Sequence, residues 1–167
     1  MDTMDRMNNI RKAQIKDCRT IIDILNRTTL FLHNKGIFQW EYPWDDVEIK
    51  EDIILGSLYV LEISDQIIGT FGLKPKISIG DISLEDSAVY LYQIAIDPAH
   101  QGSGHGRELI DFCKEIREII YLDCWSGNLK LRDFYMSNGF EYIKDLPEED
   151  FFVSVFRWES KPLDSRL

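Results

Sequence analysis

Apolar residues recur every three to four positions in four segments of the chain, a period that indicates amphipathic helices with one buried face. Those segments are residues 17–36, 46–56, 107–117 and 128–139. Shorter runs rich in branched and aromatic residues favour strands. Those runs are residues 9–13, 57–64, 66–73, 88–96, 119–125, 140–144 and 151–158. The polar connection at residues 74–87 predicts no element.

The order of these elements predicts an α/β (α+β) fold. Some strands are separated by a helix, whereas residues 57–64 and 66–73 flank Asp65 in the manner of a hairpin. This mixture favours a mixed sheet with helices on both faces. The length fits a single domain over residues 1–167, with a core at about residues 8–158.

The composition limits the kinds of binding partner and the cellular compartment that we expect. A formal net charge of −10 argues against nucleic acid, whose phosphates it would repel, and mildly favours cationic partners. No apolar run approaches the roughly 20 residues of a membrane span, and the polar N-terminus lacks a signal core, so we expect a cytoplasmic protein without membrane contact. Three cysteines without CxxC spacing indicate free thiols, and three histidines without ligand spacing predict no metal site.

Three of the ten glycines, Gly102, Gly104 and Gly106, fall between a predicted strand and a predicted helix. Glycine gives the backbone access to positive φ, and the start of a helix adds unpaired N–H donors. A strand, a glycine loop and a helix in this order can cradle a phosphate, although a tight turn without a ligand has the same pattern. The nucleotide-binding patterns GxxxxGK(S/T) and GxGxxG do not fit this loop.

The stretch QGSGHG, residues 101–106, resembles the (Arg/Gln)-x-x-Gly-x-(Gly/Ala) pyrophosphate motif of the GNAT superfamily of N-acetyltransferases. The preceding LYQIAIDPAH is similar to the strand and Asp-Pro turn of that family. The later YLDCWSGNLKLRDFYMSNGFEYI resembles its next strand, its Asn-led helix and its FY…GF signature. These pieces keep the family order over Leu91–Ile143. The resemblance implies a mostly antiparallel sheet of about seven strands with a splayed central strand.

The resemblance also implies acetyl-CoA as the cosubstrate, transferred directly in a ternary complex. In the family, loop amides hold the pyrophosphate, and the splayed strand offers its backbone to the pantetheine arm and to the thioester oxygen. A tyrosine protonates the departing thiolate, a catalytic role that falls here on Tyr135. The cofactor-binding residues carried over to this sequence are Ile94, Ala95, Ile96, Gln101, Gly102, Ser103, Gly104, His105, Gly106, Arg107, Asn128 and Tyr135.

Several of these residues have a second interpretation. Asn128 is a residue type that caps helices, and Tyr135 lies at a helical spacing that suits core packing beside Phe134. His105 suits a solvent-facing position near the phosphates. Gln101 replaces the commoner arginine of the motif and so removes one positive contact.

The acceptor amine must lose a proton before it attacks the thioester carbon, so the site needs a proton acceptor. Glu41 and Asp123 are the candidates, each with surface solvation or capping as the alternative role. Cys124 would be a nucleophile only with a lowered thiol pKa and a nearby base, and no histidine is near it in sequence. The predicted substrate-binding residues are Trp40, Tyr42, Trp44 and Tyr92, although the loop aromatics could instead fix the loop to the sheet.

The sequence therefore predicts an acetyl-CoA-dependent N-acetyltransferase that acts on a primary amine of a small, cationic acceptor. A polyamine, an amino sugar or a lysine-like metabolite would suit the negative net charge. The alternatives are a non-catalytic acyl-CoA-binding or regulatory module on the same fold, and a peptide or protein N-acetyltransferase. A monomer and a homodimer are both compatible with the sequence.

Overall fold

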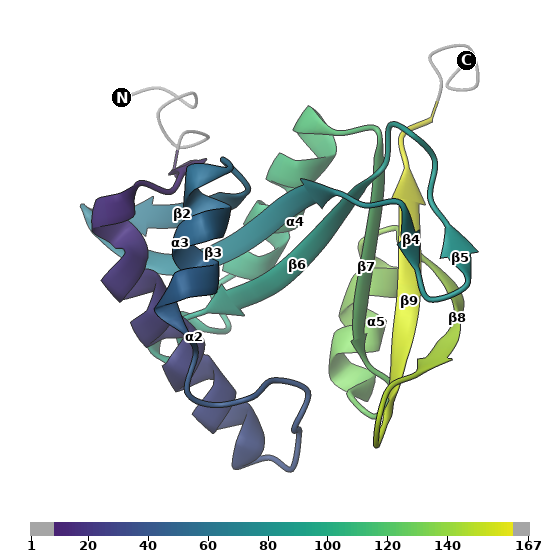
Figure 1. The fold of residues 1–167 in the computed structure, drawn as a ribbon, viewed down its shortest axis with the longest axis horizontal. Coiled ribbons are helices and arrows are strands. Elements are labelled where there is room, and N and C mark those ends of the chain that lie inside the picture. The colour runs from purple at the N-terminus through teal and green to yellow at the C-terminus, as the bar shows by residue number, and fades with distance from the viewer. Residues whose placement is uncertain (1–8, 162–167) are drawn as a thin grey trace. The chain divides into compact units, whose positions relative to one another are not determined.

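A computed structural model describes residues 9–161, which form two compact units (Figure 1). The first contains the described residues up to Leu73 together with Leu91–Phe112, and the second contains Lys74–Tyr90 and the described residues from Cys113 onward. The boundaries fall inside β3 (Gln66–Pro75), β6 (Val89–Ile96) and α4 (His105–Ile116), so these three elements contribute to both units. The single domain over residues 1–167 stays a prediction, and its ends, 1–8 and 162–167, lie outside the described residues.

The main sheet has seven strands in the order β1-β2-β3-β6-β7-β9-β8. The strands not yet introduced are β1 (Ile10–Lys12), β2 (Leu58–Ile63), β7 (Ile119–Trp125), β8 (Glu141–Pro147) and β9 (Phe152–Glu159). The pairings β1–β2, β2–β3, β7–β9 and β8–β9 are antiparallel, and β6–β7 is parallel. The predicted mixed, mostly antiparallel sheet of about seven strands is therefore confirmed.

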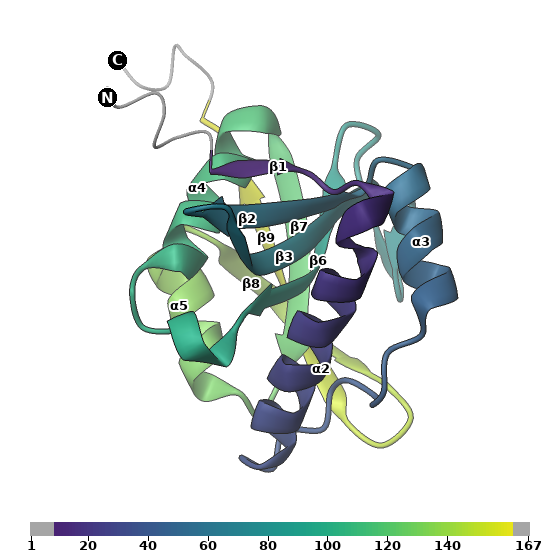
Figure 2. The same ribbon diagram turned by 90° about the vertical axis from the view of Figure 1, so that its left-hand side faces the viewer.

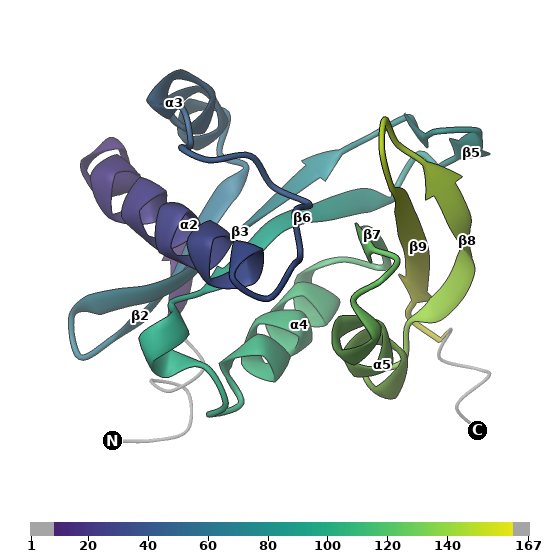
Figure 3. The same ribbon diagram turned by 90° about the horizontal axis from the view of Figure 1, so that it is seen from below.

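In the first unit, helices cover both faces of the strands. α2 (Cys18–His33) and α3 (Asp46–Ile54) lie over one face of β2 and β3 (Figure 2), and the first part of α4 lies against the opposite face (Figure 3). Two short 3-10 helices, η1 (Ile15–Asp17) and η2 (Pro98–His100), precede α2 and follow β6. Helices on both faces were expected from the order of the elements.

Apolar burial explains why α2 lies where it does. Ile21, Ile24 and Leu25 are almost fully buried, at the i, i+3, i+4 spacing of a single helix face. Burying each such side chain contributes roughly 1.5–3 kcal/mol relative to leaving it exposed. The helix begins after Asp17, whose side chain does not cap it, because the carboxylate instead accepts hydrogen bonds from Arg11 and from the backbone N–H of Gln14.

An aromatic cluster fixes α4 to the strands on the opposite face. The rings of Tyr59 on β2 and Phe71 on β3 are stacked, with centroids 5.1 Å apart. Phe112 of α4 meets them edge-on, with centroid distances of 5.7 Å to Tyr59 and 6.2 Å to Phe71. Such pairs add about 0.5–1.5 kcal/mol beyond the area they bury.

In the second unit, β9 separates two apolar layers by the alternation of its side chains. Val153 and Val155 face a cluster that includes Ile79 and Leu84, from the segment that carries β4 (Ser78–Ile79) and β5 (Ile82–Ser83). Phe156 lies at the other parity of the strand, against the helix α5 (Leu129–Ser137) (Figure 3). The polar connection between β3 and β6 thus carries two short strands that its pattern did not predict.

Gly72 of β3 lies directly against the ring of Tyr92, so we expect Gly72→Ala to destabilise the fold. A Cβ at position 72 would come within 2.3 Å of Cζ of Tyr92, which is itself buried. Overpacking of this kind costs about 1–3 kcal/mol. Equilibrium urea unfolding should show a lower midpoint with an unchanged slope. Tyr92→Leu, made in the Gly72→Ala background, should recover part of the loss, and an unchanged midpoint in Gly72→Ala would contradict the tight contact.

Candidate functional site

The glycine loop follows β6 through a turn that several hydrogen bonds define. The backbone N–H of Asp97 donates to the carbonyl of Ile68 on β3, at 2.8 Å, and the Asp97 side chain accepts from the N–H of Ala99, at 3.2 Å. Asp97 thereby caps η2, which carries Pro98 at its start. Gln101 donates from its side chain to the carbonyl of Ile96, at 3.1 Å, so its amide is used inside the turn.

Two glycines of the loop adopt the left-handed backbone conformation. Gly102 has φ 85° and Gly104 has φ 83°, and a Cβ added at either would meet no protein atom within 4 Å. Their conformation, and not protein packing, is therefore what favours glycine at these positions. The third glycine, Gly106, lies within the first turn of α4, which begins at His105, two residues before the predicted start.

The loop therefore ends at the N-terminus of a twelve-residue helix, whose first N–H groups lack helical partners. Ser103 is exposed, His105 Nδ1 lies 3.4 Å from Glu108 Oε1, and Arg107 makes only a loose surface pair with Asp111, at 3.9 Å. Backbone N–H groups and the helix dipole suit this position to an anion.

Strand β6 contains a residue whose left-handed conformation the sequence did not predict. Gln93 has φ 53° in the middle of the strand, and its buried Oε1 has no hydrogen-bond partner. A non-glycine residue at positive φ stores strain, and such residues concentrate at bulges and functional sites. The predicted backbone site, Ile94, Ala95 and Ile96, follows immediately. Glutamine has no special preference for this conformation, so its residue type gave no signal.

The pairing of β6 with β7 is short. It joins Val89 to Ile120 and Tyr90 to Tyr121. The splay of a central strand, a further expectation from the family resemblance, stays a prediction.

Tyr135 lies on α5 in an aromatic environment. Its ring contacts Phe134, Phe140 and Phe156 with centroid distances between 5.7 and 6.1 Å, and only 3% of the residue is exposed. Burial raises the pKa of the Tyr135 phenol well above its usual range, and the nearby Cys124 and Asp123 raise it further. The phenol is consequently a protonated group throughout the physiological range.

Cys124 is unsuited to nucleophilic attack in this environment. The side chain is buried, and desolvation raises the pKa of its thiol to about 12, with a further contribution from Asp123. A reactive cysteine needs the opposite shift. Cys124 therefore lacks the lowered thiol pKa that a covalent route would require.

Asp123 forms a hydrogen-bonded pair with Tyr90, which sequence reasoning missed. The Tyr90 phenol donates to Asp123 Oδ1 at 3.0 Å, and Lys76 Nζ lies 4.5 Å from the Tyr90 ring centroid. Burial raises the pKa of the Asp123 carboxyl, and the Tyr90 hydrogen bond and the Lys76 charge only partly offset that rise. Asp123 and Tyr135 interact electrostatically, so the second unit brings two of the predicted catalytic residues together.

Asn128 occupies the N-cap of α5. Its side chain accepts a hydrogen bond from the N–H of Leu131 at 3.1 Å, and the helix ends before Gly139, at φ 88°. Both ends of the helix were predicted from these residue types. The cap uses one side-chain oxygen and leaves the amide N–H₂ of Asn128 outside that hydrogen bond.

The aromatic loop between α2 and α3 is anchored by Trp44. Its backbone N–H donates to Asn26 Oδ1 at 2.9 Å, and its indole N–H donates to Thr29 Oγ1 at 2.8 Å, both on α2. Trp40 meets the Trp44 ring edge-on, with centroids 5.4 Å apart. Trp44 therefore fixes the loop, although to a helix and not to the sheet.

The other predicted acceptor residues differ in exposure. Tyr42 is 49% exposed, and Glu41 is also exposed on the same loop. Tyr92 is buried, and its phenol donates to Asp52 Oδ2 on α3 at 2.9 Å. Tyr92 thus has a packing role, whereas Tyr42 offers a ring to solvent.

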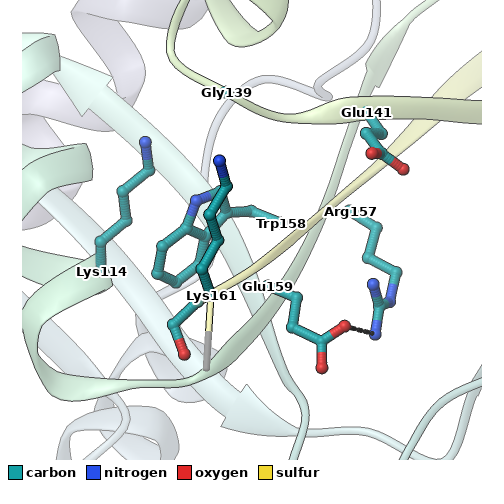
Figure 4. Close-up of a pocket in the computed structure, with 8 residues that line it drawn as sticks. Lys114, Gly139, Glu141, Arg157, Trp158, Glu159 and Lys161 are labelled. Carbon is teal, nitrogen blue, oxygen red and sulfur yellow. Dashed lines mark hydrogen bonds and ion pairs between the residues drawn. The ribbon is translucent and has the colours of Figure 1, made fainter. Parts of the chain in front are cut away.

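The second unit also has a groove of about 760 Å³ (Figure 4). Lys114 Nζ lies 5.3 Å from the Trp158 ring centroid, and Arg157 is paired with Glu159 at 3.0 Å. None of the predicted site residues lines it. Over residues 9–161, moreover, no cluster of three or more His, Cys, Asp or Glu side chains could hold a metal ion, and no helix is long and apolar enough to cross a membrane.

Comparisons with known proteins agree on one family. The family model described as "Acetyltransferase (GNAT) domain" matches residues 55–142, just over half of the chain. No curated protein matches the sequence. The chain is similar to a GNAT-family acetyltransferase from Streptococcus agalactiae, with a TM-score of 0.78 and 17% identity over 92% of this chain and 95% of the other.

Two further solved structures are similar along most of their length. A GNAT-family acetyltransferase from Listeria monocytogenes has a TM-score of 0.73 and 23% identity, over 90% of this chain and 94% of the other. YncA from Salmonella typhimurium, solved with its cofactor acetyl-CoA, has a TM-score of 0.67 and 20% identity, over 92% of this chain and 96% of the other. At these identities the likeness shows the fold.

Proposed function

We propose, from the premise that this chain belongs to the GNAT family of acetyltransferases, that it moves the acetyl group of acetyl-CoA to a primary amine by direct attack. The observation that carries the proposal is the loop at residues 101–106. Two left-handed glycines and the N-terminus of α4 present backbone donors there with open space around them. The similar YncA structure, which contains acetyl-CoA, supports the choice of cosubstrate.

The loop fits the diphosphate of acetyl-CoA by the chemistry of its donors. The backbone amides of residues 101–107 would hold the diphosphate, and the exposed side chains of Ser103 and Arg107 would be available to it as donors. The backbone of residues 94–96 would pair with the amide-like pantetheine arm, and Asn128 would offer its free N–H₂. When bound, acetyl-CoA supplies an activated acyl carbon and a thiolate leaving group.

Tyr135 would hold the proton that the departing thiolate needs. Because burial raises the pKa of its phenol, the group is in the donor form at any assay pH near neutrality. The same apolar surroundings disfavour a free thiolate and a phenolate alike, so burial keeps the proton on Tyr135 until the thiolate forms but does not by itself drive the transfer.

Asp123 is the better supported of the two candidate bases. It is half-buried beside Tyr90, and this burial raises the pKa of its carboxyl, which makes it a stronger base than an exposed aspartate. Glu41 is exposed and has no comparable environment. The acceptor we propose is a small cationic amine, because the net charge is −10 and Tyr42 presents an exposed ring to a cation.

Titration with acetyl-CoA and a thiol-release assay with a panel of amines test the proposal. Polyamines, amino sugars, lysine-like metabolites and a peptide N-terminus should all be included. Saturable binding with amine-dependent thiol release is expected. Binding without release from any amine would favour a non-catalytic acyl-CoA module, and no binding at all would overturn the proposal.

Gly104→Val should weaken acetyl-CoA binding about tenfold, because a branched residue at positive φ is strained by roughly 1–2 kcal/mol and reshapes the loop. The free energy of unfolding should fall by a similar small amount, since no protein atom lies near position 104. Gly36→Val is the matched control, with φ 80° and equally open space but a position at the end of α2. Equal affinities for acetyl-CoA in the two variants would contradict a ligand at the loop.

A further inference from the structure

Arg27 of α2 forms an ion pair with Asp97, seventy residues away in sequence. Its Nη2 lies 2.6 Å from Asp97 Oδ2, a length typical of a charge-assisted hydrogen bond. The Asp97 side chain is 12% exposed and the Arg27 side chain 53% exposed, so the arginine reaches from the surface to a largely buried carboxylate. Neither residue belongs to the predicted site.

Asp97 defines the direction in which the chain enters the glycine loop. Its Oδ1 caps η2 through the N–H of Ala99, its backbone N–H closes onto Ile68, and its carbonyl accepts from the N–H of His100 at 2.8 Å. Every polar group of Asp97 is thus hydrogen-bonded, to its own turn, to β3 or to Arg27, and Gly102 follows five residues later. Although burial alone would raise the pKa of Asp97, Arg27 and the Ala99 N–H keep it below its usual value.

The same turn of α2 holds a second segment through different side chains. Asn26 and Thr29 accept the two hydrogen bonds of Trp44 in the aromatic loop. Arg27 instead directs its hydrogen bond to the turn before the glycine loop. Contacts to the two loops can therefore be removed one at a time.

We propose that Arg27 is a positioning residue for acetyl-CoA, which acts through Asp97 to hold the glycine loop in the shape that binds the diphosphate. The inference rests on the proposed function, because it presumes that the diphosphate lies on that loop. Arg27 fixes the Asp97 carboxylate, the carboxylate fixes η2, and η2 sets the start of residues 101–106. The loop would thus be preorganised, and a loop already held in its bound shape loses less conformational entropy when the ligand binds.

The test compares two acetyl donors that differ in the diphosphate. S-acetylpantetheine carries the thioester and the arm but lacks the nucleotide and its phosphates, so it cannot engage the loop. Arg27→Gln should lower kcat/KM about tenfold with acetyl-CoA, mainly through KM, as expected for the loss of a charged hydrogen bond. With S-acetylpantetheine kcat/KM should change by less than about twofold, because this donor does not use the loop. A general structural defect would instead lower kcat/KM for both donors equally.

Four further single variants and one double variant complete the experiment. Arg27→Lys should recover part of the loss, and Asp97→Asn should imitate Arg27→Gln without adding to it in the double variant. Additive losses would mean that Arg27 contacts the phosphate itself, which would overturn the positioning role. Asn26→Ala should leave the KM for acetyl-CoA unchanged, as should Arg19→Gln, which removes an exposed pair with Asp23 on the same helix.

The outcomes separate the two proposals. If the unaltered protein does not bind acetyl-CoA, the proposed function fails. If it binds and Arg27→Gln binds equally well, or if both donors lose activity to the same extent, the proposed function stands and the role of Arg27 is wrong.

Discussion

Replacing Tyr135 with Phe is expected to lower kcat about a hundredfold, because positioned acid–base groups contribute 10²- to 10⁴-fold. The Kd for acetyl-CoA should change by less than about twofold, since the ring stays in its aromatic surroundings and only the hydroxyl is lost. Thiol release under saturating substrates measures kcat, and calorimetric titration measures Kd. No alkaline limb from Tyr135 is expected below about pH 10, since burial raises the pKa of the phenol above its usual value.

Tyr142→Phe is the matched control for that experiment. Tyr142 contacts the same Phe156 ring, at 5.7 Å, but its phenol is directed to Asp145 on the exposed strand β8. Removing that hydroxyl should leave kcat unchanged. If Tyr135→Phe and Tyr142→Phe gave the same kcat as the unaltered protein, Tyr135 would be a packing residue only, which was the alternative that its helical spacing offered.

The pattern of apolar and polar residues predicted helices and strands well where that pattern follows from the burial of one or both faces. The apolar run of residues 119–125, interrupted by Asp123, is β7 without a shift, because a strand covered on both faces has few polar positions. Gly139 ends α5 in the left-handed conformation that its residue type favours. The helix after the glycine loop begins two residues early, at His105, because Gly106 is compatible with a helical turn as well as with the loop.

Long-range contacts account for what the sequence did not predict. The helix predicted from residue 46 begins there, and the preceding Asp45 caps it by accepting the N–H of Val47. The strands β4 and β5 are only two residues each, too short for the alternation of their apolar residues to predict them, and Ile79 and Leu84 pack on distant strands.

The candidate site shows the same contrast between local motifs, which the sequence reveals, and long-range contacts, which it does not. The family motif identified the glycine loop and Tyr135, whereas Tyr90–Asp123 and Arg27–Asp97 join residues 33 and 70 positions apart. The roles of all these residues remain predictions. What the fold adds is their surroundings: a phenol buried among aromatic rings, a half-buried carboxylate beside a second phenol, and an arginine paired with the turn before the glycine loop.

Asp123→Asn is expected to lower kcat about a hundredfold, because the amide keeps the shape of the side chain and cannot take the amine proton. Glu41→Gln should change kcat by less than about twofold, since that exposed loop residue lacks a comparable environment. The two variants share the same chemical change, so they form a matched pair. If Glu41→Gln abolished turnover and Asp123→Asn did not, the assignment of the base would be reversed.

The pH dependence of kcat tests the same assignment through Tyr90. A base works in its ionised form, so kcat should fall as the pH falls through the pKa of Asp123, and burial places that pKa above the ordinary value of 3.8. The Tyr90 hydrogen bond favours the ionised carboxylate and lowers the pKa, so Tyr90→Phe should move the acidic limb to higher pH. Asp123→Asn should remove that limb. It should not reduce the free energy of unfolding at neutral pH, because a carboxyl whose pKa is raised on folding destabilises the native state once the pH exceeds that pKa. A limb that stayed in place in both variants would mean that another group takes the proton.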